Sequence, residues 1–299
     1  MFKNILVPLD GSKLAETAVS PAASLAKTLG APVTLLHIIE KDAPQEVHSD
    51  HHLTKPDEAS AYLQKVALSF GGDLKVETHV HTAEVKDVAA SIIQHASEEF
   101  NPDLIVMCSH GSGGFRDLIF GSIAQQVLAG GKTPLLLLQP ETVGSSPFRL
   151  RRILVPLDSE SVHDESLHYA EELCKAYGAE AYLLTVIPTY ETLSGQEAAI
   201  SSMLPSSATV LLDFYEEIAR EHLQMHLNEF LEAGHETEAE IGRGDPAEII
   251  VETAARVAAD IILLSTHRKA GVNAFWARSV APNVVRKTHL PLLLVPLKE

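Results

Sequence analysis

The chain has 299 residues, of which 45% are hydrophobic, and its 40 acidic residues against 23 lysines and arginines give a net charge of −17 at pH 7. This charge argues against binding to nucleic acid or to an anionic membrane, because both surfaces require Lys and Arg to neutralise phosphate groups. No apolar run reaches bilayer-spanning length, no signal peptide precedes the first strand, and two cysteines make no disulfide framework, so we expect a cytoplasmic protein.

The first half of the chain alternates short apolar runs with segments of helical periodicity. Residues 5–9 predict a strand, and the apolar positions between Leu14 and Leu29 recur every three to four residues before Gly30, which is typical of a helix with a glycine cap. The remaining elements expected are strands at 33–39, 74–79, 104–108 and 134–138 and helices at 59–69 and 85–99. Continuous apolar strands separated by helices predict a doubly wound parallel sheet.

The second half repeats the first. KNILVPLD at residues 3–10 returns as RRILVPLD at 151–158, and PDLIVMCSHG at 102–111 returns as ADIILLSTHR at 259–268. A period of this length is that of a whole domain. We therefore predict two tandem Rossmann-like α/β domains, at residues 1–141 and 149–299, joined by a Gly-, Ser- and Pro-containing linker at 142–148.

Ligands in doubly wound sheets bind beyond the carboxyl ends of the strands. The loop after the strand at 104–108 contains Gly111, Gly113 and Gly114, and Gly121 with Ser122 then begins a helix. Glycines let the main chain approach an anion closely, and the free N–H groups of a helix N-terminus suit a phosphate. If the glycines are considered without any other motif, the alternative is that they only allow the chain to turn and bind no ligand.

The VPLD strand end, the LLHIIE strand and this glycine loop together resemble the universal stress protein family in its tandem two-domain form. The family's ATP-binding signature is Gly, two residues, Gly, nine residues, then Gly followed by Ser or Thr. Gly111, Gly121 and Ser122 match it, whereas Cys108 replaces the first glycine, so a tighter pocket and weaker nucleotide binding are expected.

The resemblance implies an adenine nucleotide α-hydrolase-like fold and a site for ATP, ADP or AMP in the first domain, with Mg²⁺ as an optional companion of the nucleotide. It also implies that the closing strands at 133–140 and 289–296 pair antiparallel, giving a pseudo-two-fold internal dimer. A further homodimer is left open. The residues implied for the site are Pro8, Leu9, Asp10, Ile38, Met107, Cys108, Gly111, Gly121, Ser122, Ile123 and Ala124.

The loop of the second copy differs at the positions that matter for phosphate. Ser265, Arg268 and Arg278 replace the three signature glycines, so the second domain is expected to be a degenerate, structural copy. The alternative is a different anionic ligand, because guanidinium groups suit phosphates and carboxylates.

A run of histidines follows the second strand of the first copy. His48, His51 and His52 lie close in sequence, but metal ligands must converge in space, so a solvated surface loop is the preferred interpretation over a metal site. A redox role for Cys108 is a minor alternative, because no basic residue stands beside it in the sequence.

The leading hypothesis is a regulatory or sensor protein of the stress response that binds nucleotide in its first domain and acts on an unknown protein partner. No nucleophile stands with a base at motif spacing and no P-loop lysine follows the glycines, so at most slow, incidental ATP hydrolysis is expected. Two alternatives remain open: an interaction scaffold that binds no nucleotide, and an ATP-consuming enzyme.

Overall fold

The computed structural model describes residues 2–47, 50–109, 122–139, 148–158, 164–193, 195, 199, 205–266 and 280–297. The backbone forms two compact units. The first contains the chain up to Arg149 and the last strand, and the second contains the remainder of the described residues. Both are α/β units built on parallel strands, as the sequence predicts.

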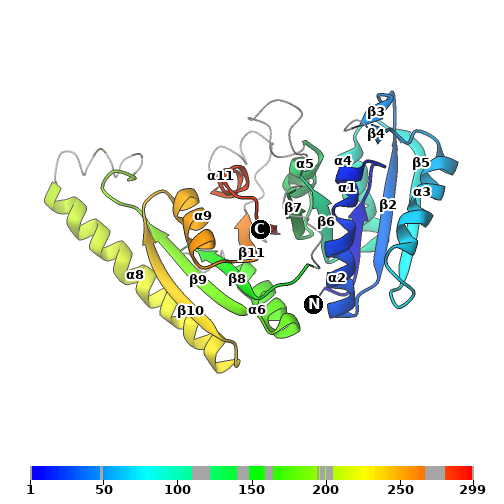
Figure 1. Cartoon of the computed structure of the whole chain (residues 1–299). Helices are drawn as coiled ribbons and strands as arrows, with labels where there is room; N and C mark the ends of the chain where they lie inside the picture. The colour runs from blue at the N-terminus through cyan, green and yellow to red at the C-terminus, as the bar shows by residue number, and fades with distance from the viewer. Residues whose placement is uncertain are drawn as a thin grey trace. The chain divides into compact units, whose positions relative to one another are not determined.

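The first unit contains six neighbouring sheet strands in the order β12-β7-β6-β1-β2-β5 (Figure 1). All neighbouring pairs are parallel except β12 and β7. The strand order reverses between β1 and β6, which is where a doubly wound sheet leaves a crevice for ligand. The strands are β1 (Ile5–Pro8), β2 (Val33–Glu40), β5 (Val76–Val85), β6 (Leu104–Cys108), β7 (Leu135–Leu138) and β12 (Leu292–Pro296).

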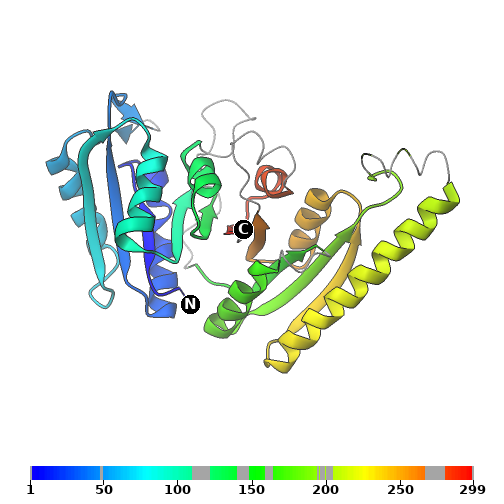
Figure 2. The same ribbon diagram turned by 180° about the vertical axis from the view of Figure 1, so that it is seen from behind.

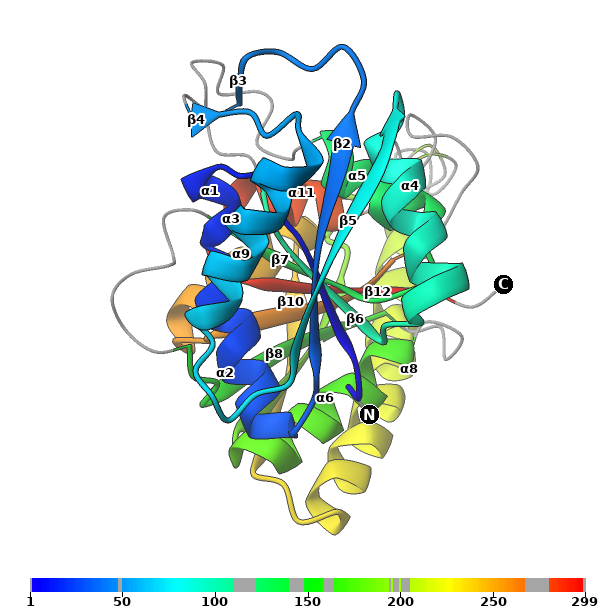
Figure 3. The same cartoon turned by 90° about the vertical axis from the view of Figure 1, so that its right-hand side faces the viewer.

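Helices cover both faces of this sheet. Figure 3 shows α1, α2 and α3 on one side of the strands and α4 and α5 on the other. The central strands are accordingly buried along their length, whereas the edge strand β5 is largely exposed. The helices are α1 (Lys13–Glu16), α2 (Val19–Leu29), α3 (Pro56–Leu68), α4 (Val88–His95), the π-helix η1 (Ala96–Phe100) and α5 (Ser122–Gly130), and a small hairpin is made by β3 (Glu46–Val47) and β4 (Asp50–His51).

The expectation of a single helix between residues 14 and 29 is wrong, because the segment forms two helices, α1 and α2. Pro21 has no N–H to donate to the carbonyl of Thr17, so the regular helical ladder cannot continue through this point. The amides of Thr17 and Ala18 instead bond three residues back, to Leu14 and Ala15. The break directs the short helix α1 over the end of β6, which it contacts.

The antiparallel pairing expected for the closing strands is found. Leu292, Leu293 and Leu294 of β12 face Leu137, Leu136 and Leu135 of β7 in register. All six side chains are almost fully buried. The C-terminal strand of the chain therefore completes the sheet of the first unit, where it covers the edge of β7.

The second unit has four parallel strands in the order β10-β9-β8-β11. Figures 1 and 2 show α6 and α8 on one side of these strands and α9 and α11 on the other. No helix in the described part of the chain is long and apolar enough to cross a bilayer. The elements are β8 (Arg152–Leu157), α6 (Glu165–Tyr177), β9 (Glu180–Ile187), α8 (Pro205–Glu232), β10 (Thr237–Arg243), α9 (Pro246–Arg256), β11 (Ile261–Thr266) and α11 (Val280–Lys287).

Candidate functional site

A pocket lies at the carboxyl ends of β1, β2 and β6 in the first unit, at the reversal of strand order. Its empty space is about 750 Å³, including the part at the mouth that is open to solvent. The residues that line it are Pro8, Leu9, Asp10, Ser12, Leu14, Ala15, Leu36, His37, Ile38, Glu40, Val47, His52, Val88, Ile92, Met107, Cys108 and Ile123.

Seven of the residues that the sequence singles out come together here: Pro8, Leu9, Asp10, Ile38, Met107, Cys108 and Ile123. Ala124 is fully buried in α5 and is not among the lining residues. Ser122 is the first residue of α5, as expected, but its side chain is outside the described part of the structure. Gly111 and Gly121 also lie outside the described residues.

A buried histidine organises the floor of the pocket. His37 is 1% exposed, its Nδ1 lies 2.7 Å from the carbonyl oxygen of Leu9, and its Nε2 lies 3.0 Å from that of Leu53. A neutral imidazole donates to one of these carbonyls and an imidazolium donates to both. His37 therefore joins the end of β1 to the segment after the β3–β4 hairpin.

The turn after β1 is fixed by a chain of short hydrogen bonds. Asp10 Oδ1 accepts from the amide of Ser12 at 2.9 Å and from its hydroxyl at 2.7 Å, and Ser12 Oγ accepts from the amide of Ala15 at 3.1 Å as the cap of α1. Between them, Gly11 has a φ of +92°, and a Cβ there would lie 2.7 Å from Leu53. The turn thus requires glycine at position 11.

The walls of the pocket are apolar and carry no Lys or Arg among the described lining residues. Ile38 and Met107 offer the apolar contact that an aromatic base prefers, and Asp10 is a carboxylate within the same pocket. Ile123 belongs to the first turn of α5, so the N-terminal end of this helix faces the pocket. Any anion bound there would be held by backbone N–H groups and the helix dipole.

Burial determines the protonation of the Cys108 thiol, which lines the pocket. Cys108 is 6% exposed, and desolvation raises the pKa of its thiol, while a hydrogen bond from Thr17 opposes and the charge of Asp10 adds to the rise. Its Sγ donates to the carbonyl of Ser109 at 3.3 Å. A protonated, buried thiol is a poor nucleophile, which argues against the redox alternative.

Sequence reasoning missed several lining residues, including Ser12, His37, Glu40, Val88 and Ile92. A polar histidine inside the apolar run LLHIIE was the available indication for His37. Val88 and Ile92 lie four residues apart on one face of α4, but only the folded sheet shows that this face reaches the pocket.

The histidine loop is not simply a solvated surface loop, and that expectation is wrong for His52. This side chain is 5% exposed, lines the pocket, and has its Nε2 3.8 Å from Glu40, whereas His51 is exposed and lies 3.7 Å from Glu58. The two imidazoles thus face different carboxylates. His48 is outside the described residues.

The corresponding positions of the second unit are built differently. The offset of 148 residues that relates Asp10 to Asp158 relates His37 to Thr185, whose buried hydroxyl has no hydrogen-bond partner among the described residues. Ser265 stands in place of Cys108, and its Oγ accepts from the amide of Ser166 at 3.2 Å. The expectations for Arg268 and Arg278 concern residues outside the described part of the chain.

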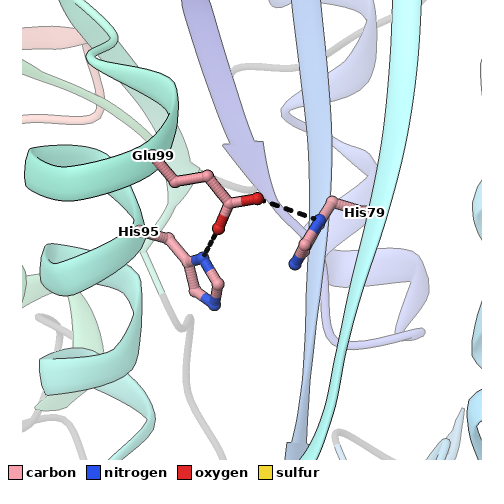
Figure 4. Close-up of side chains that lie close together, drawn as sticks. All are labelled: His79, His95 and Glu99. Atoms are coloured by element: carbon pink, nitrogen blue, oxygen red, sulfur yellow. Dashed lines mark hydrogen bonds and ion pairs between the residues drawn. The ribbon is translucent and has the colours of Figure 1, made fainter.

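A second cluster of polar side chains lies in the first unit between the edge strand β5 and the end of α4. His95 Nδ1 is 2.7 Å from one carboxylate oxygen of Glu99, His79 Nδ1 is 3.6 Å from the other, and His95 Nε2 is 2.9 Å from His81 Nδ1. Figure 4 shows His79 and the pair His95 and Glu99 facing each other across this gap. We call this group the β5–α4 histidine cluster.

Comparison with known proteins agrees with the fold and the repeat. The family model described as "Universal stress protein family" matches twice, at residues 1–139 and 149–296. A universal stress protein of Synechocystis sp. is 33% identical over 136 residues, which is 46% of this chain and 85% of that protein, and one of Methanocaldococcus jannaschii is 26% identical over 147 residues, 46% and 83% of the two chains.

Among solved structures, a universal stress protein from Archaeoglobus fulgidus aligns with 100% of this chain and 98% of its own, at a TM-score of 0.73 and 19% identity. At that identity the likeness concerns the fold alone. With one family model covering each half of the sequence and the same tandem α/β architecture in the structure, the chain belongs to the universal stress protein family as a two-domain member.

Proposed function

We propose that the pocket of the first unit binds an adenine nucleotide, ATP, ADP or AMP, and that the protein is a regulatory or sensor module of the cytoplasmic stress response. The main support is the pocket itself, where apolar walls, a carboxylate and a helix N-terminus meet at the reversal of strand order. These three features suit a base, ribose hydroxyl groups and phosphates respectively.

The arrangement favours binding over catalysis. The hydroxyl of Ser12 donates to Asp10 and accepts from Ala15, and the side chain is fully buried, so it serves the turn. The thiol of Cys108 is held protonated by burial, and His37 directs both ring nitrogens to main-chain carbonyls. Among the described lining residues, none is therefore an activated nucleophile.

Regulation would operate through a shift in conformational population. Phosphates bound at the N-terminus of α5 would favour one conformation of the first unit, and the changed surface would be read by a protein partner. Mg²⁺ would accompany the nucleotide as a counterion, because the described lining residues supply no lysine or arginine.

The test uses a charge placed at the N-terminus of α5. Ile123→Glu puts a carboxylate in the first turn, where it stabilises the helix but repels a phosphate, and Ile123→Gln is the matched neutral control. We expect the melting temperature of the wild-type protein to rise with ATP, ADP or AMP, and the affinity of Ile123→Glu to fall by roughly tenfold or more, an energy of about 1.4 kcal/mol.

Ile123→Gln should bind nearly as the wild type does, which would separate charge from size. Absence of bound nucleotide in the purified protein together with no thermal shift would overturn the proposal and favour the interaction scaffold. Rapid phosphate release from ATP would favour the ATP-consuming enzyme.

A further inference from the structure

Two histidines and an aspartate converge in the second unit, far in sequence from every residue of the nucleotide pocket. His222 and His226 are four residues apart on α8 and therefore lie on the same face of that helix. Asp164 is the residue immediately before α6. We call these three residues the α8 histidine cluster.

The three donor atoms form a small triangle. Asp164 Oδ2 is 3.1 Å from His222 Nε2 and 3.0 Å from His226 Nε2, and the two Nε2 atoms are 3.2 Å apart. Tetrahedral zinc with ligands at about 2.0–2.2 Å has ligand atoms about 3.3–3.6 Å from one another. An ion just above the plane of the triangle would thus reach all three atoms with only small side-chain movement.

Hydrogen bonding alone satisfies this arrangement poorly. If both imidazoles carry a proton on Nε2, two N–H groups crowd a single oxygen of Asp164 while facing each other. The other oxygen, Asp164 Oδ1, and the other nitrogen, His222 Nδ1, are buried and have no hydrogen-bond partner among the described residues. Such unsatisfied buried polar atoms are uncommon in native proteins and call for a specific cause.

A fourth residue completes the pattern of a metal site. His226 Nδ1 lies 2.7 Å from a carboxylate oxygen of Glu229, one turn along α8. This contact places the proton on Nδ1 and leaves the lone pair of Nε2 directed at the triangle. A carboxylate that orients a ligating histidine in this way is the usual outer shell of protein zinc sites.

Burial adds to the case. The side chains of Asp164, His222 and His226 are 16%, 10% and 7% exposed. A carboxylate held in such surroundings needs a compensating charge. No lysine or arginine is among the described residues that contact the three donor atoms. A divalent cation would supply the compensating positive charge instead.

The duplication gives an internal comparison. The offset of 148 residues relates Asp164 to Glu16 of the first unit, and the helix that corresponds to α8 there is α3, which carries Tyr62 close to Glu16. Burial and the charges of Glu16 and Asp10 raise the pKa of the Tyr62 phenol, so it stays protonated. In the described part of the first unit a tyrosine thus lies beside this carboxylate, where the second unit has histidines.

We propose that Asp164, His222 and His226 bind a divalent transition-metal ion of the zinc type, with Glu229 orienting His226. Imidazole and carboxylate ligands suit Zn²⁺, Co²⁺ and Ni²⁺. Three protein ligands leave the fourth position of a tetrahedral ion to water or to a small ligand. Such an ion ties the start of α6 to the middle of α8 and stabilises the second unit.

The β5–α4 histidine cluster is a weaker candidate and serves as the control. Both ring nitrogens of His95 already have partners in Glu99 and His81, and the Glu99 side chain is 47% exposed. The distance of 3.6 Å between His79 and Glu99 also makes this cluster looser than the α8 histidine cluster.

The experiment is a calorimetric titration of the full-length, chelator-treated protein with Zn²⁺. We expect one tight site, lost in His222→Ala and His226→Ala and retained in His95→Ala. Glu229→Gln should weaken binding by about 10- to 100-fold, because only the orienting contact is removed. Circular dichroism of each apo variant shows whether it is folded.

Asp164→Asn preserves size and provides a second test if a histidine variant fails to fold, and it should bind Zn²⁺ at least tenfold more weakly. Co²⁺ added to the wild-type protein should give the intense visible absorption of a tetrahedral site. No binding by the wild type, or tight binding that survives in both histidine variants or is lost in His95→Ala, would overturn the proposal.

Discussion

The buried imidazole of His37 ties two segments of the proposed nucleotide pocket together, because its Nδ1 lies 2.7 Å from the carbonyl oxygen of Leu9. The equivalent residue of the second unit, Thr185, makes no such contact with its hydroxyl among the described residues. The corresponding strands β2 and β9 thus differ, within the described residues, in whether the buried side chain at this position bonds to the main chain after the first strand.

The variant His37→Thr copies the second unit into the first. It removes the imidazole between the carbonyls of Leu9 and Leu53, so a carbonyl that accepts its N–H loses that hydrogen bond, and an unsatisfied buried group costs about 1–3 kcal/mol. We expect a lower free energy of unfolding by about 2–4 kcal/mol in urea titrations and weaker nucleotide binding. Thr185→Val is the matched control, since it removes an unpartnered buried hydroxyl and should be neutral or stabilising. Equal losses in both variants would contradict the argument.

Gly11→Ala tests the turn that positions Asp10. The residue has a φ of +92°, and an added Cβ would lie 2.7 Å from Leu53 Cγ and Cδ1, so strain and collision combine. We expect a loss of about 2–4 kcal/mol in the free energy of unfolding. Gly30→Ala, with a φ of +66° and open space around it, should lose about 1 kcal/mol. Similar midpoints for the two variants in urea would refute the role given to Leu53.

Cys108→Gly restores the glycine that the family signature has at this position. Because the Cys108 side chain lines the pocket, its removal should tighten nucleotide binding several-fold in calorimetry. The same change should cost stability, by about 1–2 kcal/mol, since a buried side chain is lost from a strand. The affinity and the stability of Cys108→Ala should lie between those of the wild type and of Cys108→Gly. Unchanged affinity in the glycine variant would show that the thiol does not restrict the site.

The two thiols should be inert in the folded protein. Burial, with the charge of Glu171, raises the pKa of Cys174 to about 12, and burial also raises that of Cys108. At pH 8 we expect negligible reaction with an aromatic disulfide reagent in buffer and the release of two equivalents in denaturing urea. Fast labelling of Cys108 in the native state would revive the redox alternative.

His79 should make the protein less stable in mild acid. Desolvation lowers its pKa from 6.5, with Glu99 opposing and the neighbouring His95 and His81 adding to the decrease. The unfolded chain therefore binds this proton at a higher pH than the folded chain, and the free energy of unfolding falls as pH decreases through about 6.5. The loss is complete once the pH is below the folded-state pKa.

His79→Gln removes the titrating group, so its stability should decline less between about pH 7 and pH 5 than that of the wild type. His51→Gln, at a side chain that is 72% exposed, is the matched control for the loss of a histidine. Parallel pH profiles for His79→Gln and the wild type would contradict this assignment.

Much of the fold could be predicted because local sequence patterns indicate its strands and helices. The buried strands are continuous apolar runs, and Gly30 ends α2 in the left-handed conformation expected of a glycine cap. The division into α1 and α2 was missed because it depends on the backbone bond that Pro21 cannot make, which periodicity of side chains does not record.

Seven of the residues singled out from the sequence line the pocket, whereas lining residues on β2, on α4 and in the segment after the β3–β4 hairpin were missed. Asp10 and Cys108 follow directly from their places at the ends of β1 and β6. His52 was assigned to solvent because a polar loop looks the same in sequence whether it folds over a pocket or away from it. Its burial against Glu40 is a property of the folded hairpin.

The sequence by itself determined the duplication, the α/β class, the family and the strand ends that bear the proposed nucleotide site, because these depend on repeated motifs and on the local alternation of apolar strands and helices. Only the tertiary structure decided that Asp164, 58 residues before His222, meets the two histidines of α8 within 3.1 Å. Convergence across such a separation is set by how α6 and α8 both pack against β9, and no local pattern encodes that packing.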